Sequence, residues 1–126
     1  MIRMAKLFFS LGSLLGGLAV VAGAYGAHAG AKHLTTEHVV TFSKAVRYQM
    51  HHALVLLAVA WAITQWPRQA KLIMGAGWLF LAGILLFSGS LYLLAFDVVD
   101  LGYVTPTGGV AFISGWLLLV WAAWKG

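Results

Sequence analysis

The side chains that could carry chemistry are few, and imidazoles are the most numerous of them. The histidines are His28, His33, His38, His51 and His52. A neutral imidazole can ligate Zn²⁺ or Cu²⁺, relay a proton or hydrogen-bond a ligand. The chain contains no cysteine, which excludes thiolate catalysis, disulfides and Cys-ligated metal or iron–sulfur sites.

The densest group of polar residues lies within an apolar stretch. Lys44, Arg47, Tyr48, His51 and His52 cover one broad helix face, because residues three, four and seven apart share a side. Ionisable groups inside a membrane are costly, so they usually face the bundle interior or a cavity and find partners there. We therefore expect a polar cluster in which Lys44 or Arg47 pairs with Asp97 or Asp100. Its candidate members are His28, Lys44, Arg47, Tyr48, Gln49, His51, His52, Ser88, Ser90, Tyr92, Asp97 and Asp100.

Several roles fit such a cluster. The plainest is structural, with the side chains tying the outer ends of the helices together. Another is a binding or transport site for a quinone, a lipid headgroup, a proton or a metal, since His and Tyr can hydrogen-bond a quinone. A metal or b-type haem held by histidines is disfavoured, because the adjacent His51 and His52 would point about 100° apart on a helix. We predict no metal site and no cofactor.

Signatures of catalysis are missing from the sequence. There is no Gly-rich loop followed by Lys-Ser/Thr, no HExxH and no convincing Ser/His/Asp arrangement. Ser88 and Ser90 flank a glycine, but serines in membrane helices more often bond to backbone carbonyls or across helices. The sequence thus favours a non-enzymatic protein.

Four apolar stretches must position these side chains, at residues 7–29, 45–66, 72–96 and 104–124. Each is close to the ~20 residues that a helix needs to cross a hydrocarbon core about 30 Å thick. The composition agrees, with 62% hydrophobic and 9% charged residues. We predict an all-α fold, a single integral membrane domain over residues 1–126 in the form of a four-helix bundle in the lipid bilayer.

The basic residues indicate an orientation. One predicted side carries only cations, namely Arg3, Lys6, Arg68, Lys71 and Lys125. On the other side, Lys32, Lys44 and Arg47 are balanced by Glu37, Asp97 and Asp100. The positive-inside rule then places both termini in the cytoplasm, in a multi-pass protein of the cytoplasmic (inner) membrane. Lipid headgroups explain the net charge of +5, so we expect no nucleic-acid partner.

The first connection and the start of the chain need separate interpretation. Residues 33–44 can form a short amphipathic helix on the outer membrane surface, with Thr35 or Thr36 as its N-cap. The start resembles a secretory signal, and Ala27-His28-Ala29 has the form of a cleavage site. The apolar run exceeds the ~7–15 residues of a signal core, so we predict a retained first helix.

Small residues recur at helical spacing and predict close helix packing. They are Gly12, Gly16, Ala19, Gly23, Gly26 and Gly30 in the first stretch, Gly75, Ala82 and Gly89 in the third, and Gly115 in the fourth. Small residues let helix backbones approach closely within a membrane. Spacing alone leaves open whether these seams lie inside one bundle or between copies of the chain.

Four segments in this order resemble the domain of unknown function 423 family. They are Gly23 to Gly30, Phe42 to Ala53, Leu86 to Leu94, and Thr105 to Gly109 leading to Gly115 and Trp116. These are small bacterial inner-membrane proteins, similar to a mitochondrial transmembrane family in animals. The resemblance implies four membrane helices and no known activity. It also implies that His52, rather than His51, carries the family's histidine.

We therefore predict a small polytopic membrane protein without enzymatic activity, acting as a self-associating or accessory membrane subunit in a homo-oligomer or a larger complex. The alternative is a binding or transport protein that uses the outer polar cluster. The two differ in one feature: the alternative needs a cavity that reaches His52 and Tyr48, whereas a structural cluster is closed and fully paired.

Overall fold

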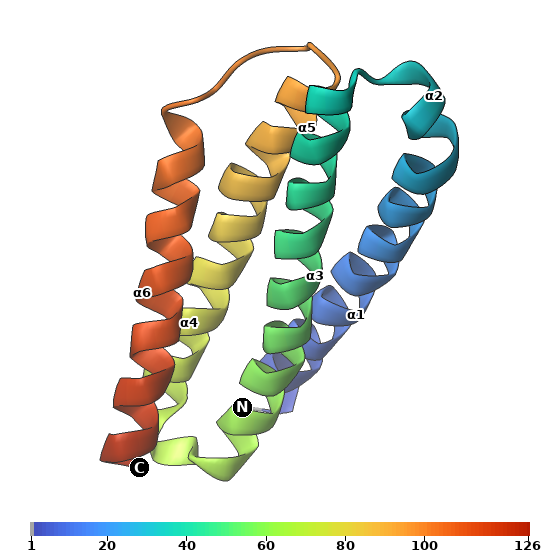
Figure 1. Cartoon of the computed structure of the whole chain (residues 1–126). Coiled ribbons are helices and arrows are strands. Elements are labelled where there is room, and N and C mark those ends of the chain that lie inside the picture. The colour runs from blue at the N-terminus through green and yellow to red at the C-terminus, as the bar shows by residue number, and fades with distance from the viewer. Residues whose placement is uncertain (1) are drawn as a thin grey trace.

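Four helical rods run side by side and alternate in direction (Figure 1) in the computed structural model, which describes residues 2–126. The first rod is α1 (Ile2–Tyr25), which continues through a π-helical turn, η1 (Gly26–Gly30), into α2 (Ala31–His33). The second is α3 (Thr36–Gln65), and the fourth is α6 (Val104–Lys125). The described residues contain no strand, and the predicted all-α fold is confirmed.

The third rod is composite. It consists of η2 (Pro67–Gln69), α4 (Ala70–Gly83), a π-helical segment η3 (Ile84–Ser88) and α5 (Gly89–Ala95). Pro67 occupies the first turn of η2, where its missing N–H costs nothing. The π-helical segments η1 and η3 were not foreseen, and such segments often occur at functional sites.

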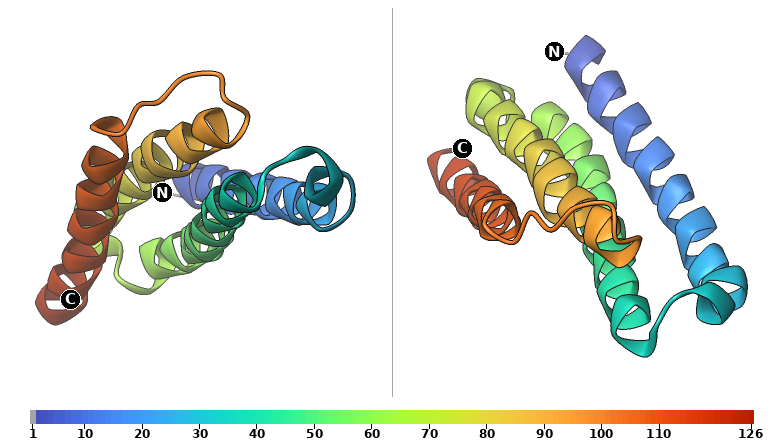
Figure 2. Two further views of the ribbon diagram at one scale, coloured as in Figure 1. Left: turned by 45° about the horizontal axis from the view of Figure 1, so that its top comes forward. Right: turned by 90° about the horizontal axis from the view of Figure 1, so that it is seen from above.

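The rods are arranged with α3 and the α4–α5 rod at the centre. Helix α1 packs mainly on α3, and α6 packs on α4 and η3, so α1 and α6 flank the central pair on opposite sides (Figure 2). Both termini and η2 lie at one end of the molecule, and the other two connections lie at the opposite end (Figure 1). We call these the terminal end and the outer end.

Three helical segments are long and apolar enough to cross a membrane: Ile2–His33, Pro67–Ala95 and Val104–Lys125. The predicted second stretch does not qualify on this criterion, because polar residues such as Arg47, Gln49 and His52 dilute the apolar character of α3. With 30 residues, α3 is about 45 Å long, enough to span a hydrocarbon core. Its central position buries Gln49 and His52, whereas Arg47 is exposed.

The predicted separate surface helix is absent from residues 2–126. Thr35 does act as an N-cap, accepting a hydrogen bond from the His38 N–H at 3.2 Å. However, the helix that begins there continues without a break into α3. The physical reason is that α3 contains no glycine or proline that would end a helix between the cap and Gln65.

Most of the predicted small residues of the first rod face α3, so this seam lies within one molecule. A Cβ on Gly12 would lie 2.7 Å from the Ala53 carbonyl oxygen, and one on Gly26 would lie 2.8 Å from the Phe42 ring. Ala19 is buried. A Cβ on Gly16 or Gly23 would make an ordinary van der Waals contact with α3, and one on Gly30 would meet Tyr25 of the same rod.

In the other rods the closest approaches only partly match the predicted seams. A Cβ on Gly115 would lie 2.7 Å from the Phe80 ring, as close packing requires. The predicted Gly75 and Gly89 have nothing nearer than 3.7 Å and 4.0 Å, and Ala82 is only half-buried. Gly77 and Gly83 are the tight positions instead, because the rings of Phe8 and Phe112 lie directly against them.

Candidate functional site

His52 is buried near the middle of α3, and both of its ring nitrogens have partners. Nδ1 lies 2.8 Å from the Tyr48 carbonyl oxygen, one helical turn away. Nε2 accepts a hydrogen bond from the Trp116 indole N–H on α6 at 3.2 Å. A carbonyl can only accept and an indole N–H can only donate, so the ring carries its proton on Nδ1 and is neutral. Neither nitrogen is left to bind a metal.

Aromatic rings enclose the imidazole of His52. It stacks on Phe112 with ring centroids 3.5 Å apart and planes 9° from parallel, Phe80 lies tilted to it, and Trp116 meets it in a T-shaped arrangement. Two glycines make this possible, because Gly83 lies against the Phe112 ring and Gly115 against the Phe80 ring. The site therefore depends on glycines from two rods.

Gln49 forms a second polar junction on the neighbouring face of α3. Its side-chain N–H donates to the Leu15 carbonyl oxygen of α1 at 2.8 Å. Its side-chain oxygen accepts from the Tyr92 hydroxyl of α5 at 2.7 Å. One buried amide thus links three rods.

Two serines form a third junction around η3. Ser88 donates to the Ala45 carbonyl oxygen of α3 at 2.8 Å. Ser90 donates to the Phe87 carbonyl oxygen at 2.9 Å, and its oxygen lies 2.6 Å from the Thr105 hydroxyl of α6. Close approach of α6 to Phe87 is possible because Gly108 faces the Phe87 backbone. These serines have the backbone and interhelical bonds expected of membrane helices.

Five of the predicted cluster residues, Gln49, His52, Ser88, Ser90 and Tyr92, thus form interactions in these three separate junctions. Every buried side-chain nitrogen and oxygen among the described residues has a hydrogen-bond partner. The reasoning from sequence missed Trp116 as a partner of His52. The sequence did contain a signal for this contact. Trp116 lies in the middle of an apolar stretch, far from its ends, and a tryptophan there needs an acceptor for its N–H.

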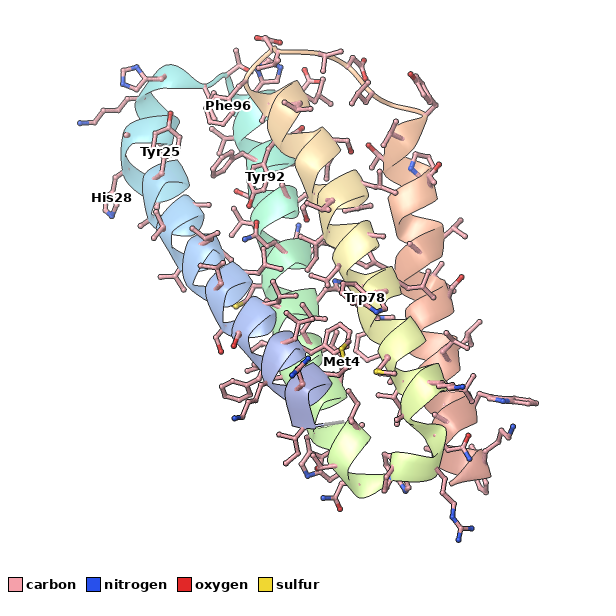
Figure 3. All side chains as sticks on the ribbon, turned by 180° about the vertical axis from the view of Figure 1, so that it is seen from behind. Met4, Tyr25, His28, Trp78, Tyr92 and Phe96 are labelled. Carbon is pink, nitrogen blue, oxygen red and sulfur yellow. The ribbon has the colours of Figure 1, made fainter. Side chains whose placement is uncertain are left out.

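The charged candidates lie elsewhere. His28 is exposed on η1 and points away from the helices (Figure 3). Lys44 and Arg47 are exposed and form no ion pair with Asp97 or Asp100, so the predicted salt bridge is wrong. The carboxylate of Asp97 instead lies 3.4 Å from His38 Nε2. The reason is geometric, since Arg47 lies on the face of α3 that borders α1, away from the loop after α5.

Possible metal ligands do not gather in the part of the chain that the structure describes. No group of three or more His, Asp or Glu side chains there could hold an ion. His51 is exposed while His52 is buried, as expected of adjacent helical residues.

A cleft of about 640 Å³ lies between α3 and α6 and reaches the buried imidazole. Its lining residues are Tyr48, His51, His52, Leu54, Phe87, Gly109, Phe112, Ile113 and Trp116. Most of this surface is apolar or aromatic. The Tyr48 hydroxyl and the His51 imidazole have no hydrogen-bond partner within residues 2–126, so both are available to a ligand.

Comparison with known proteins gives a consistent result. Residues 22–109 match the family described as "Protein of unknown function (DUF423)". The UPF0382 membrane protein YwdK of Bacillus subtilis is 42% identical over 121 residues, which cover 95% of this chain and 98% of the relative. A UPF0382 membrane protein of Haemophilus influenzae is 37% identical over 123 residues, covering 97% of each chain. No solved structure matches significantly.

Proposed function

This chain belongs to the DUF423 family of membrane proteins, and because the family's description names no activity, we propose a function from the geometry of the cleft. The proposed function is non-enzymatic binding of an uncharged, quinone-like amphiphile between α3 and α6. Its planar headgroup lies against the aromatic rings of the cleft, and its carbonyl oxygens accept hydrogen bonds from Tyr48 and His51.

The proposal is based on the observation that the cleft extends to His52 and Trp116 while the hydrogen bond between these two residues stays intact. Its volume of about 640 Å³ falls within the range of small-molecule pockets. A purely structural cluster would pair every polar group and leave no space beside it. Here Tyr48 and His51 face space, while His52 and Trp116 are occupied by each other.

The depth of the cleft favours an uncharged headgroup. His52 lies ~24 Å along α3 from Thr36 and ~20 Å from Gln65, which is close to the middle of the helix. A phosphate at that depth would need a compensating cation, because charge in the hydrocarbon region is costly. Neither Lys nor Arg lines the cleft. A neutral ring with carbonyl acceptors satisfies the two free donors without that cost.

The shape of the cleft accommodates an apolar tail. Leu54, Ile113 and Trp116 line it and are themselves exposed, so a tail leaving the headgroup continues directly into lipid. Phe87 is only partly buried and provides a ring face for offset stacking.

Self-association has weaker support. The small residues on α1 that could have joined two copies are used inside the molecule, against α3. The proposal includes an accessory role. A protein that binds a membrane-soluble ligand without transforming it serves other membrane proteins by storing the ligand or presenting it to them. The charge asymmetry supports a cytoplasmic membrane location with the terminal end inside, since that end carries Arg68, Lys71 and Lys125.

Titration of the purified protein with a short-tailed ubiquinone analogue tests the proposal, with quenching of tryptophan fluorescence as the signal. We expect saturable quenching, since Trp116 lines the cleft. Tyr48→Phe should weaken binding about tenfold through loss of one hydrogen bond. Gly109→Leu should abolish binding by filling the cleft, because a Cβ there meets only the Phe87 ring at 4.0 Å and can be accommodated.

Gly17→Leu is the matched control, because a Cβ on Gly17 of α1 has no neighbour within 4 Å and lies away from the cleft. Unchanged affinity is expected for this variant. Linear, non-saturable quenching of the wild type, or equal affinities for Gly109→Leu and Gly17→Leu, would refute binding in the cleft.

A further inference from the structure

Arg47 is a cation without an acidic partner on a membrane-spanning helix. The ion pair between His38 and Asp97 is the only one among the described residues, so no carboxylate neutralises the guanidinium. An arginine is charged at every physiological pH. A charge on the lipid-facing side of a helix needs an anion or water nearby.

Arg47 lines a groove between α1 and α3 that is separate from the α3–α6 cleft. The groove has a volume of about 380 Å³ and is bordered by Gly23, Gly26, Phe42, Ser43 and Arg47, among others. Because glycines have no side chains, the α1 side of the groove does not protrude into it. Ser43 lies one turn above Arg47 on the same face of α3 and is exposed. No hydrogen bond within residues 2–126 involves its hydroxyl.

The depth of Arg47 matches a lipid phosphate. A Cβ on Gly23 would contact Val46 at 3.6 Å, so Arg47 is level with Gly23 of α1. The π-helical turn η1 ends at Gly30, seven residues or about 10 Å further toward the outer end. A long arginine side chain can cover most of that distance while its stem stays on apolar surface. Arg47 can therefore reach the headgroup layer.

We propose that this groove binds an anionic phospholipid of the outer-end leaflet, with the phosphate held by Arg47 and Ser43 and one acyl chain lying along Gly23 and Val46. The guanidinium offers the paired donors that suit a phosphate, and the Ser43 hydroxyl supplies a third. Charge complementarity selects this occupant. This inference is independent of the proposed quinone-like ligand, which lies on the other side of α3 and is uncharged.

The test compares lipid binding by the delipidated full-length protein, using native mass spectrometry after addition of phosphatidylglycerol or phosphatidylcholine with identical acyl chains. The wild type should retain one phosphatidylglycerol in preference to phosphatidylcholine. Arg47→Gln should lower the affinity for phosphatidylglycerol about tenfold, since a charge-assisted contact is lost. Arg47→Lys keeps the charge but loses the paired donors, so an intermediate affinity is expected.

Arg68→Gln is the matched control, because Arg68 is an exposed cation at the terminal end, far from the groove. It should bind phosphatidylglycerol like the wild type. The proposal is overturned if Arg47→Gln binds as well as the wild type, or if Arg68→Gln weakens binding equally, which would indicate diffuse charge attraction. Circular dichroism of each variant, with unchanged helicity, shows that a lost lipid is not a lost fold.

Discussion

His52 illustrates how this protein keeps a polar side chain at mid-depth. Its ring donates to the Tyr48 carbonyl within α3 and accepts from Trp116 across the cleft. Both partners fix the neutral form, and the stacked Phe112 ring fixes its orientation. Removing either partner would leave a buried acceptor or donor unsatisfied, which costs more than the bond itself contributes.

Trp116→Phe tests this arrangement. Phenylalanine retains most of the ring contacts but has no N–H, so His52 Nε2 loses its donor. We expect the free energy of unfolding to fall by about 1 kcal/mol, the usual scale for a polar contact between membrane helices. Denaturant titration in mixed micelles, followed by circular dichroism, measures the change.

Trp124→Phe serves as its control, because Trp124 is 87% exposed and its indole makes no hydrogen bond within the described chain. Its stability should match the wild type. Equal stabilities for both variants would show that the His52–Trp116 bond contributes nothing.

For single side chains, the sequence predicted which residues form polar contacts better than it predicted their partners. Gln49, His52, Ser88, Ser90 and Tyr92 stood out because polar groups in apolar helices need partners. Their partners did not, since Trp116 is 64 residues from His52 and backbone carbonyls such as that of Leu15 leave no mark in a sequence. The expected ion pair between Lys44 or Arg47 and an aspartate was wrong for the same reason. The sequence assigned these cations to one face of α3, but it did not show which helix packs against that face.

Between helices, glycines decide where the rods can touch. At Gly108 the backbone of η3 approaches so closely that a Cβ would collide with the Phe87 N and Cβ atoms. This contact places Thr105 within reach of Ser90 and brings Phe112 over His52. The close contact between η3 and Gly108 thus determines where α6 packs.

The adjacent glycines Gly108 and Gly109 provide a matched pair for this element. Gly108→Ala should destabilise the fold by about 1–3 kcal/mol, because α6 must move away from a rigid backbone. Gly109→Ala should leave stability unchanged or raise it by up to ~1 kcal/mol, since its Cβ meets only the Phe87 ring at 4.0 Å and alanine is the better helix former. Thermal unfolding in detergent would separate the two, and an identical loss in both would contradict this packing.

Helix positions were predictable where composition alone determines them. The four apolar stretches correspond to the four rods, and Thr35 was recognisable as a cap. The continuation of residues 36–44 into α3 was not, because amphipathic surface helices and the ends of long spanning helices share the same pattern. The π-helical segments left no sequence signal, since they depend on tertiary contacts such as that of Gly108 with Phe87.

For the whole molecule, the orientation is testable because the chain has no cysteine. Single substitutions Asp100→Cys and Lys125→Cys place one thiol at each end, both at exposed positions. A membrane-impermeant maleimide added to intact cells should label only the cysteine at position 100, and inverted vesicles only that at position 125, as the positive-inside rule requires. The opposite pattern would reverse the orientation.

The arrangement of the rods was beyond prediction from sequence. A small-residue stripe on α1 could have packed against α3, against another rod or against a second copy. Only the structure shows α1 on α3 and α6 on the far side of the central pair (Figure 2), which leaves the cleft between α3 and α6 open to lipid.

Native mass spectrometry of the protein extracted gently from its own membrane is the most direct test of ligand binding in the α3–α6 cleft, with Gly109→Leu and Gly17→Leu analysed in parallel. We expect the wild type and Gly17→Leu to carry one uncharged adduct with the mass of a quinone or related isoprenoid, and Gly109→Leu to lack it. A wild-type protein without this adduct, whether monomer or oligomer, or an adduct that persists in Gly109→Leu, would contradict ligand binding in the cleft.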